Sequence, residues 1–111
     1  MQIHNYQTLA NRTAKELPLD KAILHVITGL SGEVGELADA IKKSEIYLQE
    51  WDMENVAEEL ADVLWFVAYA CNVFGFSMET IARQNIEKLA KRYPNAYSDH
   101  NAFARLDKEG E

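Results

Sequence analysis

The sequence contains few of the residues that break or reverse a chain, with only 2 prolines and 5 glycines among 111 residues. An all-β protein needs a turn every few residues, so this scarcity argues against one and favours helices. A single cysteine, Cys71, excludes an internal disulfide, and its apolar neighbours predict a buried thiol in a reducing compartment.

Positive charge is also scarce, because 11 Lys and Arg face 18 Asp and Glu and leave a net charge of -7. Nucleic acids and anionic membranes attract the opposite balance, so we expect neither as a partner. The N-terminal residues lack the apolar run of a secretory signal, and the longest apolar stretch, residues 63–71, is too short to cross a bilayer. We therefore expect a cytoplasmic protein.

Apolar residues recur at spacings of three and four, which predicts a single all-α domain over residues 1–111. Its core covers about residues 3–94, and a C-terminal tail covers 95–111. The expected helices span about 3–16, 20–43, 52–74 and 77–93, with Asp20 and Ser77 as N-caps and Gly75 just beyond the third helix. The tail is expected to dock through its large apolar side chains and to fray at its acidic end. These side chains are Tyr97, Phe103 and Leu106.

The second half of the third expected helix, LWFVAYACNVF, is apolar on nearly every side. A helix of this kind is buried from more than one direction. In so short a chain, we expect another subunit to supply part of the cover.

Two acidic pairs, Glu33 with Glu36 and Glu59 with Asp62, are each spaced three residues apart. This spacing places both members of a pair on the same side of a helix, and both pairs flank apolar stripes. Antiparallel packing of the two helices would bring four carboxylates to one pocket, where they repel each other unless cations lie among them. Oxygen ligands favour Mg²⁺ or Mn²⁺ over zinc or copper. No histidine follows a glutamate at the spacing of di-iron bundles. Two solvated acidic faces are the alternative.

His25, Gly29, Gly32 and Glu36 form one stripe of the second expected helix. Glycine inside a helix costs about 1 kcal/mol relative to alanine. Two glycines beside a carboxylate therefore predict either room for a ligand or close helix packing, and the sequence leaves both open.

Asn85, Lys88 and Arg92 form one strip of the fourth expected helix. Two aligned cations in an acidic protein are a candidate anion clamp, and cations beside carboxylate-bound metal are what phosphoryl chemistry needs. The alternative is a solvated face whose cations complement the helix dipole.

Three segments resemble the MazG-like all-α nucleoside triphosphate pyrophosphohydrolases, which are relatives of the dimeric all-α dUTPases and of phosphoribosyl-ATP pyrophosphohydrolase. They are GLSGEVGELADAIKK, EELADVLWFVAYA and NIEKLAKRYP, and the resemblance covers about residues 3–97. Gly32 stands where many members have the first glutamate of a pair, while the four ligand positions are intact.

The resemblance implies a four-helix bundle-like fold, a homodimer or homotetramer, and Mg²⁺-dependent cleavage between the α and β phosphates of a nucleoside triphosphate. Such enzymes include house-cleaning enzymes that remove surplus or non-standard nucleotides. Mn²⁺ is expected to substitute for Mg²⁺. By position, the metal-binding and catalytic residues are Glu33, Glu36, Glu59 and Asp62.

The same resemblance implies that Asn85, Lys88 and Arg92 contact the phosphates and sugar. His25 and Trp51 are candidates for holding the base, and each has a structural alternative, as a satisfied histidine and as an anchor for the loop. Tyr69 either packs under the base or fills the core, and we favour the core.

Two other functions remain open from the sequence. One is phosphoribosyl-ATP hydrolysis, which the segment from Asn85 to Pro94 resembles less. The other is a non-catalytic helical oligomer that binds a partner protein.

Overall fold

The computed structural model describes residues 1–108 as helices joined by short connections. The described elements are α1 (Ile3–Asn11), α2 (Leu19–Glu45), α3 (Met53–Phe74), α4 (Met78–Arg92), α5 (Asp99–Ala104) and a 3-10 helix, η1 (Leu106–Lys108). No strand occurs in this part of the chain. The all-α prediction is confirmed.

The chain divides into two compact units, Met1–Phe76 and a second that begins at Ser77. The first contains α1, α2 and α3, and the second contains α4, α5 and η1. The expectation of one domain over the whole chain stays a prediction.

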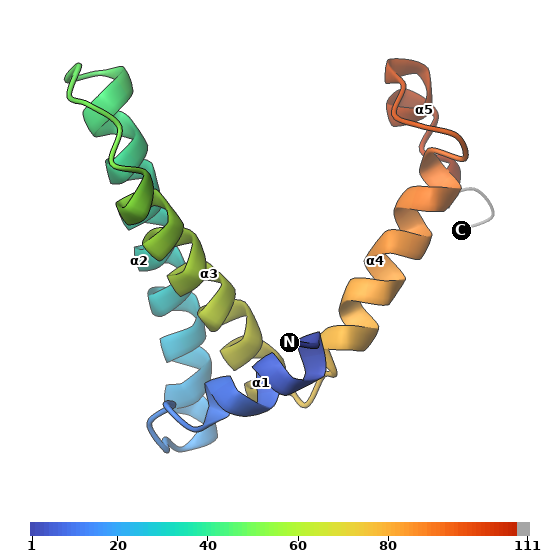
Figure 1. The fold of residues 1–111 in the computed structure, drawn as a ribbon. Coiled ribbons are helices and arrows are strands. Elements are labelled where there is room, and N and C mark those ends of the chain that lie inside the picture. The colour runs from blue at the N-terminus through green and yellow to red at the C-terminus, as the bar shows by residue number, and fades with distance from the viewer. Residues whose placement is uncertain (109–111) are drawn as a thin grey trace. The chain divides into compact units, whose positions relative to one another are not determined.

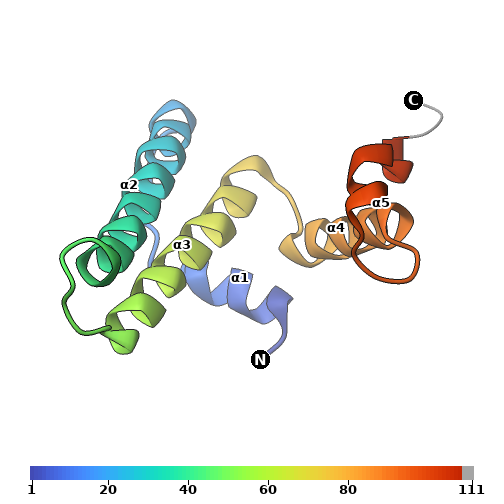
Figure 2. The same cartoon turned by 90° about the horizontal axis from the view of Figure 1, so that it is seen from above.

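In the first unit, α2 and α3 lie side by side as an antiparallel hairpin, and α1 packs against α3 at the end where α2 begins (Figures 1 and 2). Val26, Phe66 and Tyr69 form the buried centre, against which Leu30 and Trp65 pack. The antiparallel pairing is the one that the acidic motifs require if their carboxylates are to meet.

Gly29 allows this close pairing, because a Cβ there would overlap the ring of Phe66. At Gly32 and Gly35, by contrast, a Cβ would meet nothing within 4 Å. The glycine stripe therefore has two parts: close packing explains Gly29, and the surface beside Gly32 is open within this unit.

α1 is anchored to the end of α3 by two amide side chains. Gln7 Nε2 donates to Asn72 Oδ1 at 3.0 Å and to the carbonyl oxygen of Phe76 at 2.8 Å, while Asn72 Nδ2 donates back to the Gln7 carbonyl at 3.2 Å. Because Gln7 is buried, these bonds satisfy polar groups that would otherwise be costly.

The predicted N-cap Ser77 and the predicted place of Gly75 just beyond the third helix are confirmed, and Asp52, which the sequence analysis placed at the start of that helix, is its N-cap. The Asp52 side chain accepts from Asn55 N and that of Ser77 from Thr80 N, and Gly75 adopts the left-handed conformation at a φ of 74°. α2 instead begins after Pro18, so the prediction of Asp20 as N-cap is wrong and Asp20 lies in the first turn.

The predicted extent of the first helix is also wrong, because α1 ends at Asn11 rather than near residue 16. Thr13 and Ala14 form short-range turns to the carbonyls of Ala10 and Asn11. The Thr13 hydroxyl also accepts a 2.9 Å bond from Trp65 Nε1. The Thr13 N–H and hydroxyl both donate to the Ala10 carbonyl, which a continued helix would use for the Ala14 N–H.

In the second unit, α5 and η1 pack against α4. Phe103 is exposed, so the prediction that it docks the tail is wrong, whereas the ring of Tyr97, although mostly exposed, packs against that of Tyr93 with centroids 5.3 Å apart. Leu106 is half-buried, and the strongest polar link is between Arg92 and Asp107. The last three residues of the acidic end, whose fraying was predicted, lie outside the described residues.

Within residues 1–108 no single helix is long and apolar enough to cross a membrane. α3 and α4, taken together as one broken segment, pass the same test of length and composition.

Candidate functional site

Three of the four predicted metal ligands converge between α2 and α3. One carboxylate oxygen from each of Glu33, Glu59 and Asp62 lies within 4.8 Å of the others. Glu33 and Glu59 are half-buried and Asp62 is exposed, so the group lies at the surface of the helix pair. This arrangement offers three oxygen ligands to one cation.

Glu36 does not belong to this set of three, although it lies one turn from Glu33 on α2. The negative charge of Glu36 nevertheless affects the pKa of Glu59. Partial burial raises the pKa of Glu59 most, followed by repulsion from Asp62, Glu36 and Glu33. The four predicted residues thus share one electrostatic environment, with three at its centre.

No lysine or arginine among the described residues forms an ion pair with any of these carboxylates. Acidic groups held this close without a counter-charge repel each other, and a divalent cation would relieve the repulsion. The donor set consists of carboxylate oxygens alone, which suits hard cations such as Mg²⁺ and Mn²⁺. The residues present therefore fit a divalent metal.

Tyr6 of α1 is a neighbour of this site that the sequence did not single out. Burial and the charge of Asp62 both raise the pKa of the Tyr6 phenol, with burial the larger cause. The position of Tyr6 in the sequence did not indicate that it lies near Asp62, because this proximity depends on how α1 packs on α3.

His25 lies in an aromatic cluster rather than beside the carboxylates. Its ring meets those of Phe66 and Tyr69 edge-on, with centroids 5.3 and 5.2 Å away. Its Nδ1 atom is buried and has no hydrogen-bond partner. The histidine helps pack α2 against α3.

Trp51 is 48% exposed and lies in the connection between α2 and α3. Some twenty residues of helix separate it from His25, which is about 30 Å at 1.5 Å per residue. Within one chain, His25 and Trp51 therefore lie at opposite ends of the hairpin and cannot hold the same base.

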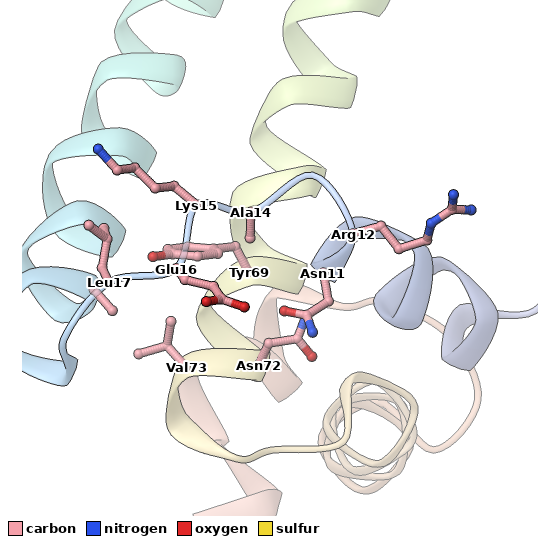
Figure 3. Close-up of a pocket in the computed structure, with 10 residues that line it drawn as sticks. Asn11, Arg12, Ala14, Lys15, Glu16, Leu17, Tyr69, Asn72 and Val73 are labelled. Atoms are coloured by element: carbon pink, nitrogen blue, oxygen red, sulfur yellow. The ribbon is translucent and has the colours of Figure 1, made fainter.

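A cavity of about 430 Å³ lies between the α1–α2 connection and the last turns of α3 (Figure 3). Tyr69 and Val73 line it from α3, and Glu16 and Leu17 line it from the connection. Tyr69 is only 4% exposed, and its hydroxyl is buried without a hydrogen-bond partner. The preference for Tyr69 as a core residue is confirmed.

The predicted phosphate-binding strip lies on α4, in the second unit. Asn85 and Lys88 are exposed. Arg92 is half-buried and paired with Asp107, a residue that the sequence analysis assigned to the fraying end.

Comparison with known proteins gives the family. The model of the MazG nucleotide pyrophosphohydrolase domain matches residues 21–97, which include every predicted site residue. The chain is 29% identical over 101 residues to the Gene 37 protein of Mycobacterium phage L5, covering 83% of this chain and 89% of that protein. It is 32% identical over 76 residues to the uncharacterized protein YvdC of Bacillus subtilis (strain 168), covering 60% and 72%. No solved structure matches the chain significantly. From the family match and the helical fold that carries it, the chain belongs to the MazG nucleotide pyrophosphohydrolase family.

Proposed function

We propose that this protein hydrolyses a nucleoside triphosphate between its α and β phosphates with the help of Mg²⁺. The observation that carries the proposal is the convergence of Glu33, Glu59 and Asp62 within 4.8 Å. A bound divalent metal supplies charge neutralisation at phosphate oxygens and lowers the pKa of water. Mn²⁺ should replace Mg²⁺, since both prefer oxygen ligands.

In the reaction, the oxygen of water forms a bond to the α phosphorus, and the bond from that phosphorus to the bridging oxygen breaks. The products are a nucleoside monophosphate and pyrophosphate. Glu36 is our choice for the residue that orients the water, because it lies outside the set of three but its charge still reaches Glu59. The other three carboxylates would hold the metal.

We place the nucleobase in the cavity beside Tyr69. Tyr69 lies seven positions after Asp62 on α3, about 10 Å along the helix axis, which matches the span of a nucleotide from phosphate to base. The side chains of Tyr69, Leu17 and Val73 offer apolar surface to the base. His25, which touches Tyr69, would then support the pocket from behind.

We also propose a homodimer or homotetramer. α2 and α3 expose many large apolar side chains, so the first unit covers only part of its own apolar surface. The exposed residues are Leu24, Ile27, Val34, Ile41, Leu60, Leu64, Val67 and Phe74. Exposed apolar surface of this extent marks interaction faces. Sedimentation analysis should give a mass of two or four chains.

The decisive experiment measures pyrophosphate release from a panel of ribo- and deoxyribonucleoside triphosphates with Mg²⁺. Glu59→Gln and Asp62→Asn should abolish turnover while circular dichroism shows unchanged helix content. Glu58→Gln is the matched control, because it removes an equal charge from the residue next to Glu59 but lies outside the set of three. Full activity in both site variants would exclude this site.

The panel also tests the proposed role in house-cleaning, which predicts a preference for non-standard or deoxyribonucleotides. If no triphosphate is hydrolysed, and calorimetry detects binding of neither Mg²⁺ nor a non-hydrolysable triphosphate, the protein is a helical interaction module instead.

A further inference from the structure

Asp107, in η1, holds Arg92 by two hydrogen bonds. Arg92 Nε donates to Asp107 Oδ1 at 2.6 Å, and Nη2 donates to Oδ2 at 3.1 Å. The side chain of Asp107 is 2% exposed and that of Arg92 is 21% exposed. Both oxygens of a buried carboxylate are therefore committed to one guanidinium.

This pair leaves part of Arg92 available for another anion. A guanidinium has five N–H donors, and Asp107 occupies one on Nε and one on Nη2. The neighbouring Tyr93, which also raises the pKa of Arg92, can take one more. At least two donors remain, and two suffice for the paired hydrogen bonds that arginine forms with a phosphate.

Arg92 lies at the end of a helix, where a contact that fixes its side chain has a large effect on ligand binding. It is the last residue of α4, with Pro94 two residues further on, and helix ends of this kind fray. A free arginine there loses rotamer freedom when it binds a ligand. An arginine already fixed by a buried carboxylate has lost that freedom in folding.

We propose that Asp107 is a positioning residue that holds Arg92 in a fixed orientation to bind the phosphate chain of the triphosphate. The inference rests on the proposed function and on the expectation, implied by the family resemblance, that Arg92 contacts the phosphates of the substrate. Asp107 touches neither substrate nor metal in this role. It acts only through the guanidinium.

An opposite role, in which Asp107 competes with phosphate for Arg92, fits the burial poorly. Release of Arg92 would leave a carboxylate that is almost fully buried without a partner, and an unpaired buried charge is costly. A purely structural role, in which the pair only docks η1 on α4, is the second alternative. It predicts a stability change without a change in phosphate binding.

Three variants separate these roles. Asp107→Asn keeps the shape and removes the charge. Arg92→Lys keeps a positive charge beside Asp107 but loses the planar guanidinium with its paired donors. It should therefore preserve the docking of η1 on α4 and impair phosphate binding. Asp107→Glu should restore part of the lost affinity. Glu79→Gln is the matched control, because it breaks the exposed ion pair of Glu79 with Arg83 on the same helix.

Two measurements apply to each variant: kcat and KM for the triphosphate that the wild type hydrolyses best, and calorimetric binding of tripolyphosphate with Mg²⁺. We expect Asp107→Asn and Arg92→Lys each to raise KM and weaken tripolyphosphate binding by about tenfold, with kcat within about twofold of the wild type. The double variant should be no worse than either single variant, because both changes remove the same interaction. Glu79→Gln should leave both measurements unchanged.

An unchanged KM in Asp107→Asn with a lower Tm would show that the pair only docks the segment. A lower KM would show that Asp107 competes with phosphate. If Asp107→Asn does not fold, Arg92→Lys decides the question, and wild-type affinity there overturns the proposal. A wild type that hydrolyses no triphosphate would instead refute the proposed function, and the positioning role would fall with it.

Discussion

Replacing Gly29 by alanine tests the packing that brings the carboxylates together. The new Cβ would overlap three atoms of the Phe66 ring. That ring cannot swing aside freely, because it is packed against the rings of His25, Trp65 and Tyr69. We therefore expect either strain in the core or separation of α2 from α3.

Two opposing effects set the magnitude. Alanine is favoured over glycine inside a helix by about 1 kcal/mol. An extra methyl group in a filled core costs about 1–3 kcal/mol. Gly32→Ala is the matched control, because it has the same helix gain and its Cβ would meet nothing within 4 Å. The helix term cancels between the two variants, so Gly29→Ala should be less stable than Gly32→Ala by about 1–3 kcal/mol.

Urea denaturation of both variants at one protein concentration measures this difference. For a domain of this size, a difference of about 2 kcal/mol corresponds to roughly 10 °C in Tm. Gly29→Ala should also weaken Mn²⁺ binding, since helix separation moves Glu33 away from Glu59. Equal stability of the two variants would refute the close contact between Gly29 and Phe66.

The remaining predictions concern the site and the buried thiol. Mg²⁺ at ten times its Kd should stabilise the wild type by about 1.4 kcal/mol in a thermal-shift assay, and Asp62→Asn should abolish the effect; an equal shift in both would place the ion elsewhere. Glu36→Gln should lower kcat by about 100-fold or more but keep most of the Mn²⁺ affinity measured by calorimetry. A parallel loss of kcat and Mn²⁺ affinity would show that Glu36 is a metal ligand. Lys88→Ala should raise KM for the triphosphate about tenfold with little change in kcat, and a loss confined to kcat would contradict a binding role. Burial raises the pKa of Cys71, so at pH 8 the folded protein should react with a thiol reagent far more slowly than the protein in urea; rapid reaction of the folded protein would contradict this burial.

The sequence predicted α3 and the start of α4 well because their signals are local. The predicted N-cap Ser77 bonds within its own helix, and Gly75 needs only its own backbone freedom to end α3, whose predicted start at Asp52 is also close to the observed one. The end of α1 is different: the Thr13 N–H and hydroxyl donate to the Ala10 carbonyl, and Trp65 of α3 donates to the Thr13 hydroxyl. Helical spacing continues through that segment, so the pattern of apolar residues does not indicate this turn.

The same distinction applies to the candidate site. A helical wheel gives the direction in which a side chain points, which was enough to predict that Glu33, Glu59 and Asp62 face one groove. It does not give the axial register of one helix against the other. That register, set in part where Gly29 meets Phe66, leaves Glu36 outside the set of three. Asp107 was missed because its partner is 15 residues away and the two meet only once the chain has folded back.

The spacing between the carboxylates and the cavity on α3 has a consequence for turnover. A rigid helix holds Asp62 and Tyr69 at a fixed interval, so only a molecule of sufficient length can occupy both places at once. Under the proposed reaction a nucleoside monophosphate still reaches both places, whereas pyrophosphate carries no base and can occupy only the place near Asp62. The helix would therefore retain the monophosphate more firmly than pyrophosphate, without any moving part.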